Sequence, residues 1–147
     1  MPADFVDTNV IIYLLEKDAA RAARAEKLIA AGAIVSVQVL NEIVSTGRRK
    51  APERWEELGA FLDRLRPLLT IVPLTVDTHR LAVDLIGRYG FAPYDSAIVA
   101  SALLAGCETL WSEDMQDGLI VERQLTIRNP FSPGSPARRW PGRRARR

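Results

Sequence analysis

Four carboxylates stand at separated places along the chain, each where a strand is predicted to end or a helix to begin. They are Asp7, Glu42, Asp95 and Asp114. Like charges that converge raise one another's pKa and resist ionisation unless a cation neutralises them, so a folded domain gains nothing by gathering them without a ligand. Hard oxygen ligands favour Mg²⁺ or Mn²⁺ over zinc, and the chain has no Cys/His cluster that would argue for zinc. If the four acids converge, they predict a site for Mg²⁺ or Mn²⁺.

The acids need elements that bring them together, and the spacing of apolar residues predicts such elements. Short strands are expected at residues 3–6, 33–35, 70–72, 109–112 and, more weakly, 125–127. Helices are expected after residue 10 and at 18–31, 36–50, 52–67, 76–89 and 93–104. Short apolar strands that alternate with helices indicate an α/β fold, in which a parallel sheet of four to five strands is covered on both faces.

In open α/β sheets, ligand sites form beyond the carboxyl ends of the strands. Asp7 ends the first predicted strand and Asp114 lies just past the fourth, so both belong at that edge. Glu42 lies among apolar helix residues, where an ionised side chain is expensive to bury without a partner. Asp95 is in the first turn of a helix rich in small residues, which suits close packing on the sheet. A ligand site would explain the positions of all four.

Each acid also has an ordinary structural explanation. Asp7 could end a strand, Asp114 could cap a turn, Asp95 could complement a helix N-terminus, and Glu42 could be a surface residue. Taken alone, each explanation is about as good as a ligand role. Together they require four independent accidents at one edge of one sheet, which favours a single site.

Several neighbours of the acids have two interpretations. Asp117 is either a fifth acid of the site or a turn former before Gly118. Thr8, Asn9 and Ser112 flank the acids and could hold water or orient a carboxylate, although capping explains Thr8 almost as well.

Other charged residues are expected to face solvent. Asp4 and Glu113 are expected to be solvated, and His79 is expected on a helix surface rather than as a ligand or base. The run Arg48, Arg49 and Lys50 could contact phosphates, but basic residues at a helix end are usually a solvated terminus.

Length and composition fit one compact domain. With 147 residues, 48% of them hydrophobic, the chain can bury roughly two-thirds of its unfolded surface in one core. The single cysteine, Cys107, cannot form an intramolecular disulfide, and residues 1–4 lack the features of a secretory signal. The uncharged apolar stretch at 97–107 is about half of the roughly 20 residues that span a bilayer. We expect a soluble, cytoplasmic protein.

The charge is unevenly distributed. Residues 132–147 hold six of the 20 basic residues and no acid, which leaves 14 basic against 18 acidic groups in residues 1–131, a net charge of −4. A segment rich in Pro, Gly and Arg cannot offset its own ordering entropy, so a disordered tail is expected. It would either attract nucleic acid through phosphates or be a passive extension.

Five segments taken in order resemble the PIN-domain ribonucleases, and closely the VapC-type toxins of prokaryotic toxin-antitoxin pairs. They are Val6-Asp7-Thr8-Asn9-Val10, Val39-Leu40-Asn41-Glu42, Tyr94-Asp95-Ser96-Ala97-Ile98, Ser112-Glu113-Asp114-Met115 and Thr126-Ile127-Arg128-Asn129-Pro130-Phe131. Each segment alone is weak evidence, but the ordered set, which covers residues 1–131, is specific. The resemblance implies a PIN-like, Rossmann-like three-layer sandwich, Mg²⁺- or Mn²⁺-dependent cleavage of RNA, frequent homodimers, and inhibition by a cognate VapB-type antitoxin.

The resemblance also implies roles for residues. Asp7, Glu42, Asp95 and Asp114 fall on the family's acidic positions, and Ser112 falls on a hydroxyl position that often precedes the last acid. Asp7 and Asp95 are our first choices for direct metal ligands, with Glu42 and Asp114 direct or acting through water. Two features depart from the pattern. Ser96 stands where relatives often have alanine, and the arginine tail is not a family requirement.

Two other classes of function stay open. A phosphatase of the haloacid dehalogenase type also has an aspartate after its first strand, but it needs a second one two positions later, where this chain has Asn9. A non-catalytic RNA-binding or scaffold domain could keep the fold without cleaving RNA. A metal-dependent cleavage assay separates that class from an enzyme.

One helix face carries a hypothesis about partners. The apolar stripe is Trp55, Leu58, Leu62 and Leu65. It is expected either to line a groove for a second copy or an antitoxin, or to pack on its own domain as an ordinary amphipathic helix.

Overall fold

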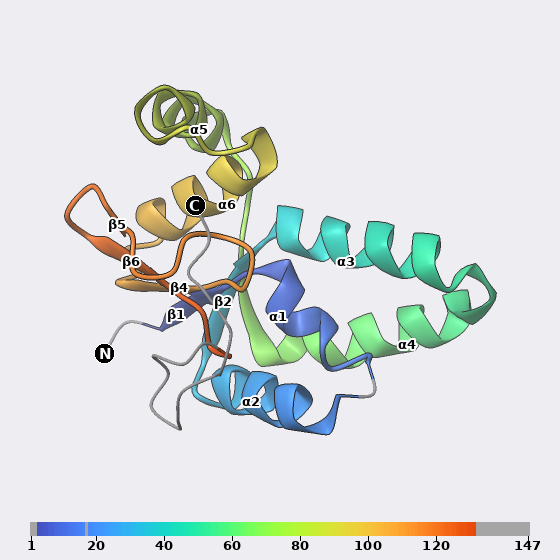
Figure 1. The fold of residues 1–147 in the computed structure, drawn as a ribbon. Coiled ribbons are helices and arrows are strands. Elements are labelled where there is room, and N and C mark those ends of the chain that lie inside the picture. The colour runs from blue at the N-terminus through green and yellow to red at the C-terminus, as the bar shows by residue number, and fades with distance from the viewer. Residues whose placement is uncertain (1–2, 17, 132–147) are drawn as a thin grey trace.

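A computed structural model describes residues 3–16 and 18–131, which form one sheet with helices packed around it (Figure 1). The elements are β1 (Asp4–Val6), α1 (Thr8–Ile12), α2 (Ala19–Ala30), β2 (Ala33–Ser36), α3 (Val37–Lys50), the short 3₁₀ helix η1 (Pro52–Arg54), α4 (Trp55–Leu65), the 3₁₀ helix η2 (Arg66–Leu68), β3 (Leu69–Val72), α5 (Val76–Tyr89), α6 (Pro93–Leu104), β4 (Thr109–Trp111), β5 (Ile120–Val121) and β6 (Leu125–Arg128). The predicted tail, residues 132–147, lies outside the described residues.

The sheet has six strands in the order β3-β2-β1-β4-β6-β5. The first five of these are parallel to their neighbours, and β5 runs antiparallel to β6. The chain moves from β1 outward to β2 and β3, then returns to place β4 on the other side of β1. The order therefore reverses between β1 and β4, and a ligand crevice is expected at the carboxyl ends of these two strands.

The predicted α/β class and parallel sheet are confirmed, but the predicted number of strands is wrong. β5 has two residues, which is too short to show a period of alternation. It is joined to β6 by a tight turn in which Glu122 and Arg123 adopt positive φ angles of 53° and 57°. Non-glycine residues seldom adopt this conformation, so the local sequence does not signal the turn.

Local signals placed the helices well. α3 begins after Ser36, whose hydroxyl accepts a hydrogen bond from the backbone N–H of Val39 at 3.4 Å. α5 begins after Thr75, which forms a capping box with Thr78, and ends at Gly90 with a φ of 75°. α5 and α6 occupy the predicted residues. None of the described helices combines the length and apolarity needed to cross a bilayer.

The helices are arranged in layers about the sheet. In Figure 1, α5 and α6 lie above the sheet and α2 lies below it, while α3 and α4 extend to the right as a helical pair. Strand residues on both faces of the sheet are completely buried, among them Phe5 and Leu110 on one face and Val6 on the other.

The apolar stripe of α4 packs inside the domain. Leu58, Leu62 and Leu65 are buried in the core, and Trp55 alone of the four is largely exposed, at 51%. Leu58 packs against α3 so closely that a Cβ atom added at Gly47 would lie 2.8 Å from it. The hypothesis that this stripe lines a groove for a partner is therefore wrong for the three leucines, since burial within one's own domain leaves no surface for another chain.

The buried stripe leads to a stability prediction. Leu62→Ala is expected to lower the free energy of unfolding by about 2–5 kcal/mol, because it removes transfer energy and leaves a cavity. Trp55→Ala serves as the control, since a half-exposed side chain contributes less. Urea unfolding followed by circular dichroism measures both. Equal, small effects would show that α4 is not part of the cooperative core.

Candidate active site

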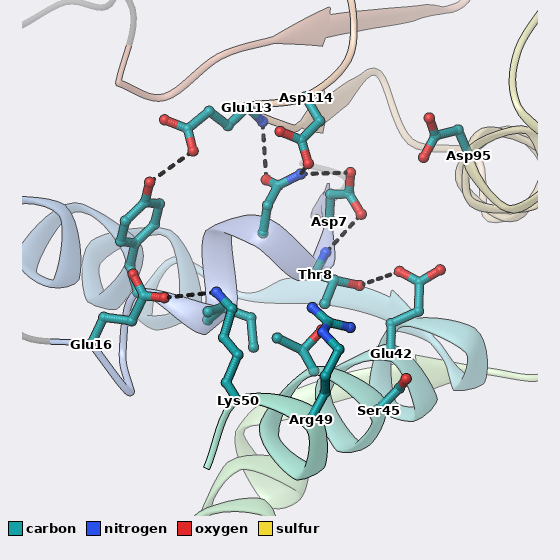
Figure 2. Close-up of a pocket in the computed structure, with 14 residues that line it drawn as sticks. Asp7, Thr8, Glu16, Glu42, Ser45, Arg49, Lys50, Asp95, Glu113 and Asp114 are labelled. Atoms are coloured by element: carbon teal, nitrogen blue, oxygen red, sulfur yellow. Dashed lines mark hydrogen bonds and ion pairs between the residues drawn. The ribbon is translucent and has the colours of Figure 1, made fainter.

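The four predicted acids line one pocket with a volume of about 470 Å³ (Figure 2). Asp7 directly follows β1, and Asp114 is the third residue after β4. Glu42 comes from α3, and Asp95 from the first turn of α6. The predicted convergence is thus present at the carboxyl edge of β1 and β4. The role of these acids as ligands stays a prediction.

Asp7 lines the pocket and is only 3% exposed. Its carboxylate accepts hydrogen bonds from the backbone N–H of Thr8 at 2.7 Å and from the Ser112 hydroxyl at 2.8 Å. Burial nevertheless raises the pKa of Asp7 to about 7, because the loss of hydration outweighs these bonds and the charges of Asp95 and Glu42 add to it. Without a cation, Asp7 is therefore partly protonated near neutral pH.

Asn9 connects the two acids that follow the strands. Its amide nitrogen Nδ2 donates to Oδ2 of Asp7 and to Oδ2 of Asp114, each at 3.1 Å. Its oxygen Oδ1 accepts a hydrogen bond from the backbone N–H of Glu113 at 3.0 Å. Asn9 therefore orients two carboxylates at once, as expected for a supporting residue.

Glu42 is held by two donors. The Thr8 hydroxyl donates to Oε1 at 2.7 Å, and Nε2 of Gln38 donates to Oε2 at 3.0 Å. Gln38 also donates to the backbone oxygen of Tyr94 at 3.0 Å, which ties α3 to the start of α6 beside Asp95. Gln38 was not predicted as part of the site. Its position one helical turn before Glu42 was the available signal.

Asp95 is half-buried, and the described residues donate no hydrogen bond to its carboxylate. Burial raises its pKa above the usual value, and the charges of Glu42 and Asp114 raise it further. Uncompensated repulsion of this kind is relieved when a cation enters.

The donor chemistry fits a hydrated hard cation. Among residues 3–16 and 18–131, no three or more His, Cys, Asp and Glu side chains are already arranged to bind a metal ion together. Mg²⁺ seldom requires one, since it keeps several waters and uses one or two carboxylates directly. Asp7 and Asp95, with oxygens facing the same pocket, provide such a pair.

Of the three basic residues at the end of α3, two line the pocket and one does not. Arg49 and Lys50 line the pocket, and Figure 2 shows them extending from α3. Nζ of Lys50 lies 3.5 Å from Oε2 of Glu16 in a half-exposed ion pair. Arg48, on the same helix, does not line the pocket.

Three other polar residues lie away from the pocket. Asp117 does not line it, and its Oδ1 accepts a hydrogen bond from the backbone N–H of Asn129 at 2.9 Å, as expected for a turn former. Asp4 was expected to be solvated, but it is half-buried and accepts a hydrogen bond from Nε1 of Trp111 at 2.8 Å. His79 is exposed on α5, as expected.

The prediction that Glu113 is solvated is also wrong. Instead of facing solvent it is 9% exposed. Oε1 accepts a hydrogen bond from the Tyr13 hydroxyl at 2.8 Å, and Oε2 accepts one from the Arg21 guanidinium at 2.5 Å. Burial raises the pKa of Tyr13 to about 12, and the hydrogen bond to Glu113 contributes, so the hydroxyl remains a donor. Both partners are far away in sequence, which is why no local pattern reveals this cluster.

Solved structures with a similar fold include a toxin-antitoxin complex and a toxin. A toxin-antitoxin complex from Klebsiella pneumoniae aligns with a TM-score of 0.67 and 18% identity over 87% of this chain and 98% of that chain. FitAcB from Neisseria gonorrhoeae gives 0.67 and 19% over 87% and 98%. Mycobacterium tuberculosis VapC20, described as a sarcin-ricin loop cleaving toxin, gives 0.61 and 22% over 76% and 89%. At identities this low, the structural similarity establishes a shared fold and nothing more.

A comparison with curated proteins finds no match. The family model described as PIN domain matches residues 5–116, which is well over half of the chain and includes all four acids. The chain belongs to the PIN domain family.

Proposed function

We propose that this protein is a Mg²⁺- or Mn²⁺-dependent endoribonuclease that acts in the cytoplasm as the toxin of a toxin-antitoxin pair. One observation carries the proposal. Asp7, Glu42, Asp95 and Asp114 come from four elements to one pocket, and among the described residues no basic side chain forms an ion pair with any of them. A cation is the simplest partner for such a group.

The residues have distinct proposed roles. Asp7 and Asp95 would hold the ion directly, and Glu42 and Asp114 would hold it directly or through water. When bound, a divalent ion supplies an activated water and neutralises charge that develops on the phosphodiester. Thr8 and Gln38 orient Glu42, while Ser112 and Asn9 orient Asp7.

Two basic residues that line the pocket support the proposal that the substrate is RNA. Arg49 and Lys50 line the pocket beside the acids and would bind phosphates that flank the cleaved bond. The structural neighbour VapC20 is described as cleaving the sarcin-ricin loop, which supports RNA cleavage here.

The structural neighbours also support a partner. Several are complexes named VapBC or FitAB, among them VapBC2 from Rickettsia felis. We propose a cognate VapB-type antitoxin and a homodimer for this chain. Pull-down of co-expressed candidate antitoxins and sedimentation of the purified protein test these two points separately.

Sequencing the RNA ends left by the purified protein tests the activity. Total RNA is incubated with Mg²⁺ and, in parallel, with excess EDTA. New ends at defined positions are expected in Mg²⁺ alone. Ends that form equally in EDTA would refute metal dependence. RNA binding without new ends would indicate the non-catalytic alternative.

The charge of residues 132–147 leads to a separate prediction. A chain that ends at Phe131 should keep its metal dependence and cleavage positions but bind RNA more weakly at low salt, because six arginines are lost. Its affinity should also fall less steeply with salt, by about 0.7 in the log–log slope for each lost phosphate contact on single strands. Filter binding at several salt concentrations measures both. An unchanged slope would mark the segment as passive, and lost cleavage at saturating RNA would place it in the active site.

A further inference from the structure

The loop that carries Asp114 is anchored by a buried ionic cluster next to the pocket. The cluster consists of Glu113, Arg21 from α2, and Tyr13, just after α1. The side chains of Arg21 and Glu113 are only 11% and 12% exposed, and they meet at 2.5 Å. With the Tyr13 hydroxyl at 2.8 Å, both carboxylate oxygens of Glu113 have a donor. Glu113 is thus occupied as an anchor.

Aromatic rings fix the position of Arg21. Its guanidinium carbon lies 5.2 Å from the centre of the Tyr13 ring and 4.9 Å from that of Phe131. The two rings are themselves in edge-to-face contact, with centroids 5.0 Å apart. A planar cation held by two rings and a carboxylate has little freedom to move. Glu113, the second residue after β4, is therefore tied to a rigid point on α2.

The backbone of Glu113 passes this constraint to the acids. Its N–H donates to Oδ1 of Asn9 at 3.0 Å, which turns the amide nitrogen of Asn9 toward the pocket. That nitrogen donates to Asp7 and Asp114. If Glu113 moved, Asn9 would lose the bond that sets its orientation, and Asp114 would lose its register with Asp7.

We propose that Arg21 is a positioning residue for the metal site, acting through Glu113 to hold Asn9 and Asp114 in the arrangement that a divalent cation requires. The inference rests on the proposed function, because it concerns the same four acids. It adds to that function a residue on α2 that does not line the pocket itself.

Arg24 offers a matched control on the same helix. Its guanidinium carbon also lies against an aromatic ring, 5.2 Å from the centre of Trp111, and its Nε donates to the backbone oxygen of Pro130 at 3.4 Å. It resembles Arg21 in partial burial and in aromatic contact, but Trp111 and Pro130 lie outside the loop that carries Glu113. A purely structural role for arginine on α2 predicts similar effects for both residues.

The experiment compares Arg21→Gln, Tyr13→Phe and Arg24→Gln in the full chain. Mn²⁺ affinity is measured by electron paramagnetic resonance of the unbound ion, and Tm without metal is measured by circular dichroism. Arg21→Gln should weaken Mn²⁺ binding by about tenfold, the range found for residues that orient ligands, and Tyr13→Phe should weaken it less. Arg24→Gln should lower Tm while its Mn²⁺ affinity stays at the wild-type value. In a Glu113→Gln background, Arg21→Gln should have little further effect, because the two act through one contact.

Three results would overturn the proposal. Wild-type Mn²⁺ affinity in folded Arg21→Gln is the first, and equal losses of affinity in Arg21→Gln and Arg24→Gln are the second. If Arg21→Gln does not fold, unchanged affinity in Tyr13→Phe is the third. A wild-type protein that binds no Mn²⁺ would instead refute the proposed function, so the two failures can be told apart.

Discussion

Asp7→Asn is expected to reduce Mg²⁺-dependent RNA cleavage by at least about 10²-fold, the loss typical when one preorganised electrostatic group is removed from an active site. The substitution keeps the shape of the side chain and removes one of the charges that face the pocket. Asp95→Asn should have an effect of the same order, because both acids are proposed as direct ligands. Initial rates on an RNA identified by end sequencing, at saturating Mg²⁺, measure both variants.

Glu108→Gln is the matched control for this experiment. Glu108 is an exposed acid that precedes β4, so it lies at the opposite edge of the sheet from the pocket. Glu108→Gln changes the net charge of the protein by the same amount as Asp7→Asn. The cleavage rate of the Glu108→Gln variant should equal that of the wild type. Wild-type rates in Asp7→Asn or Asp95→Asn would refute the assignment of the active site. Equal losses in all three variants would point to the overall charge of the protein instead.

The sequence predicted the acidic pocket because its logic is largely local. Asp7 and Asp114 follow buried strands, and the carboxyl ends of parallel strands share one edge. Glu42 and Asp95 needed a weaker argument, namely that an acid among apolar or small residues requires a reason to be there. Helix ends were predictable for the same cause, since Ser36, Thr75 and Gly90 act on their immediate neighbours.

The errors all concern contacts between separate elements of the chain. Glu113 looks like any solvated acid until α2 brings Arg21 to it from 92 residues away. The apolar stripe on α4 could have faced a partner or its own domain, and nothing local says that Leu58 is covered by α3 of the same domain. β5 exists only because β6 lies beside it. Tertiary packing decides these features, and a periodicity in one segment cannot contain them.

The pocket should also leave a signature in the stability of the metal-free protein. Burial raises the pKa of Asp7 to about 7 from the ordinary aspartate value of 3.8. Between these values the folded protein holds a proton that the unfolded chain has released, so stability falls as pH rises from about 4 to 7. A shift of this size corresponds to a loss of up to about 4 kcal/mol above pH 7 relative to pH 4, and a bound cation would reverse it.

Asp7→Asn should remove that pH dependence. In EDTA at pH 8 we expect the variant to be more stable than the wild type by about 1–3 kcal/mol, because it no longer buries a charge. The gain is smaller than the full pKa shift implies, since Nδ2 of Asn9 loses an acceptor. At pH 4.5 the order should reverse or the difference vanish, since Asp7 is then protonated in the folded wild type. Added Mg²⁺ should stabilise the wild type at pH 8 and leave Asp7→Asn unchanged. Urea unfolding at the two pH values, with Glu108→Gln as the control, measures these differences. If Asp7→Asn is less stable than the wild type by the same amount at both pH values, then Asp7 is ionised and fully satisfied by its hydrogen bonds without a cation, and the physical argument for a metal at this position fails.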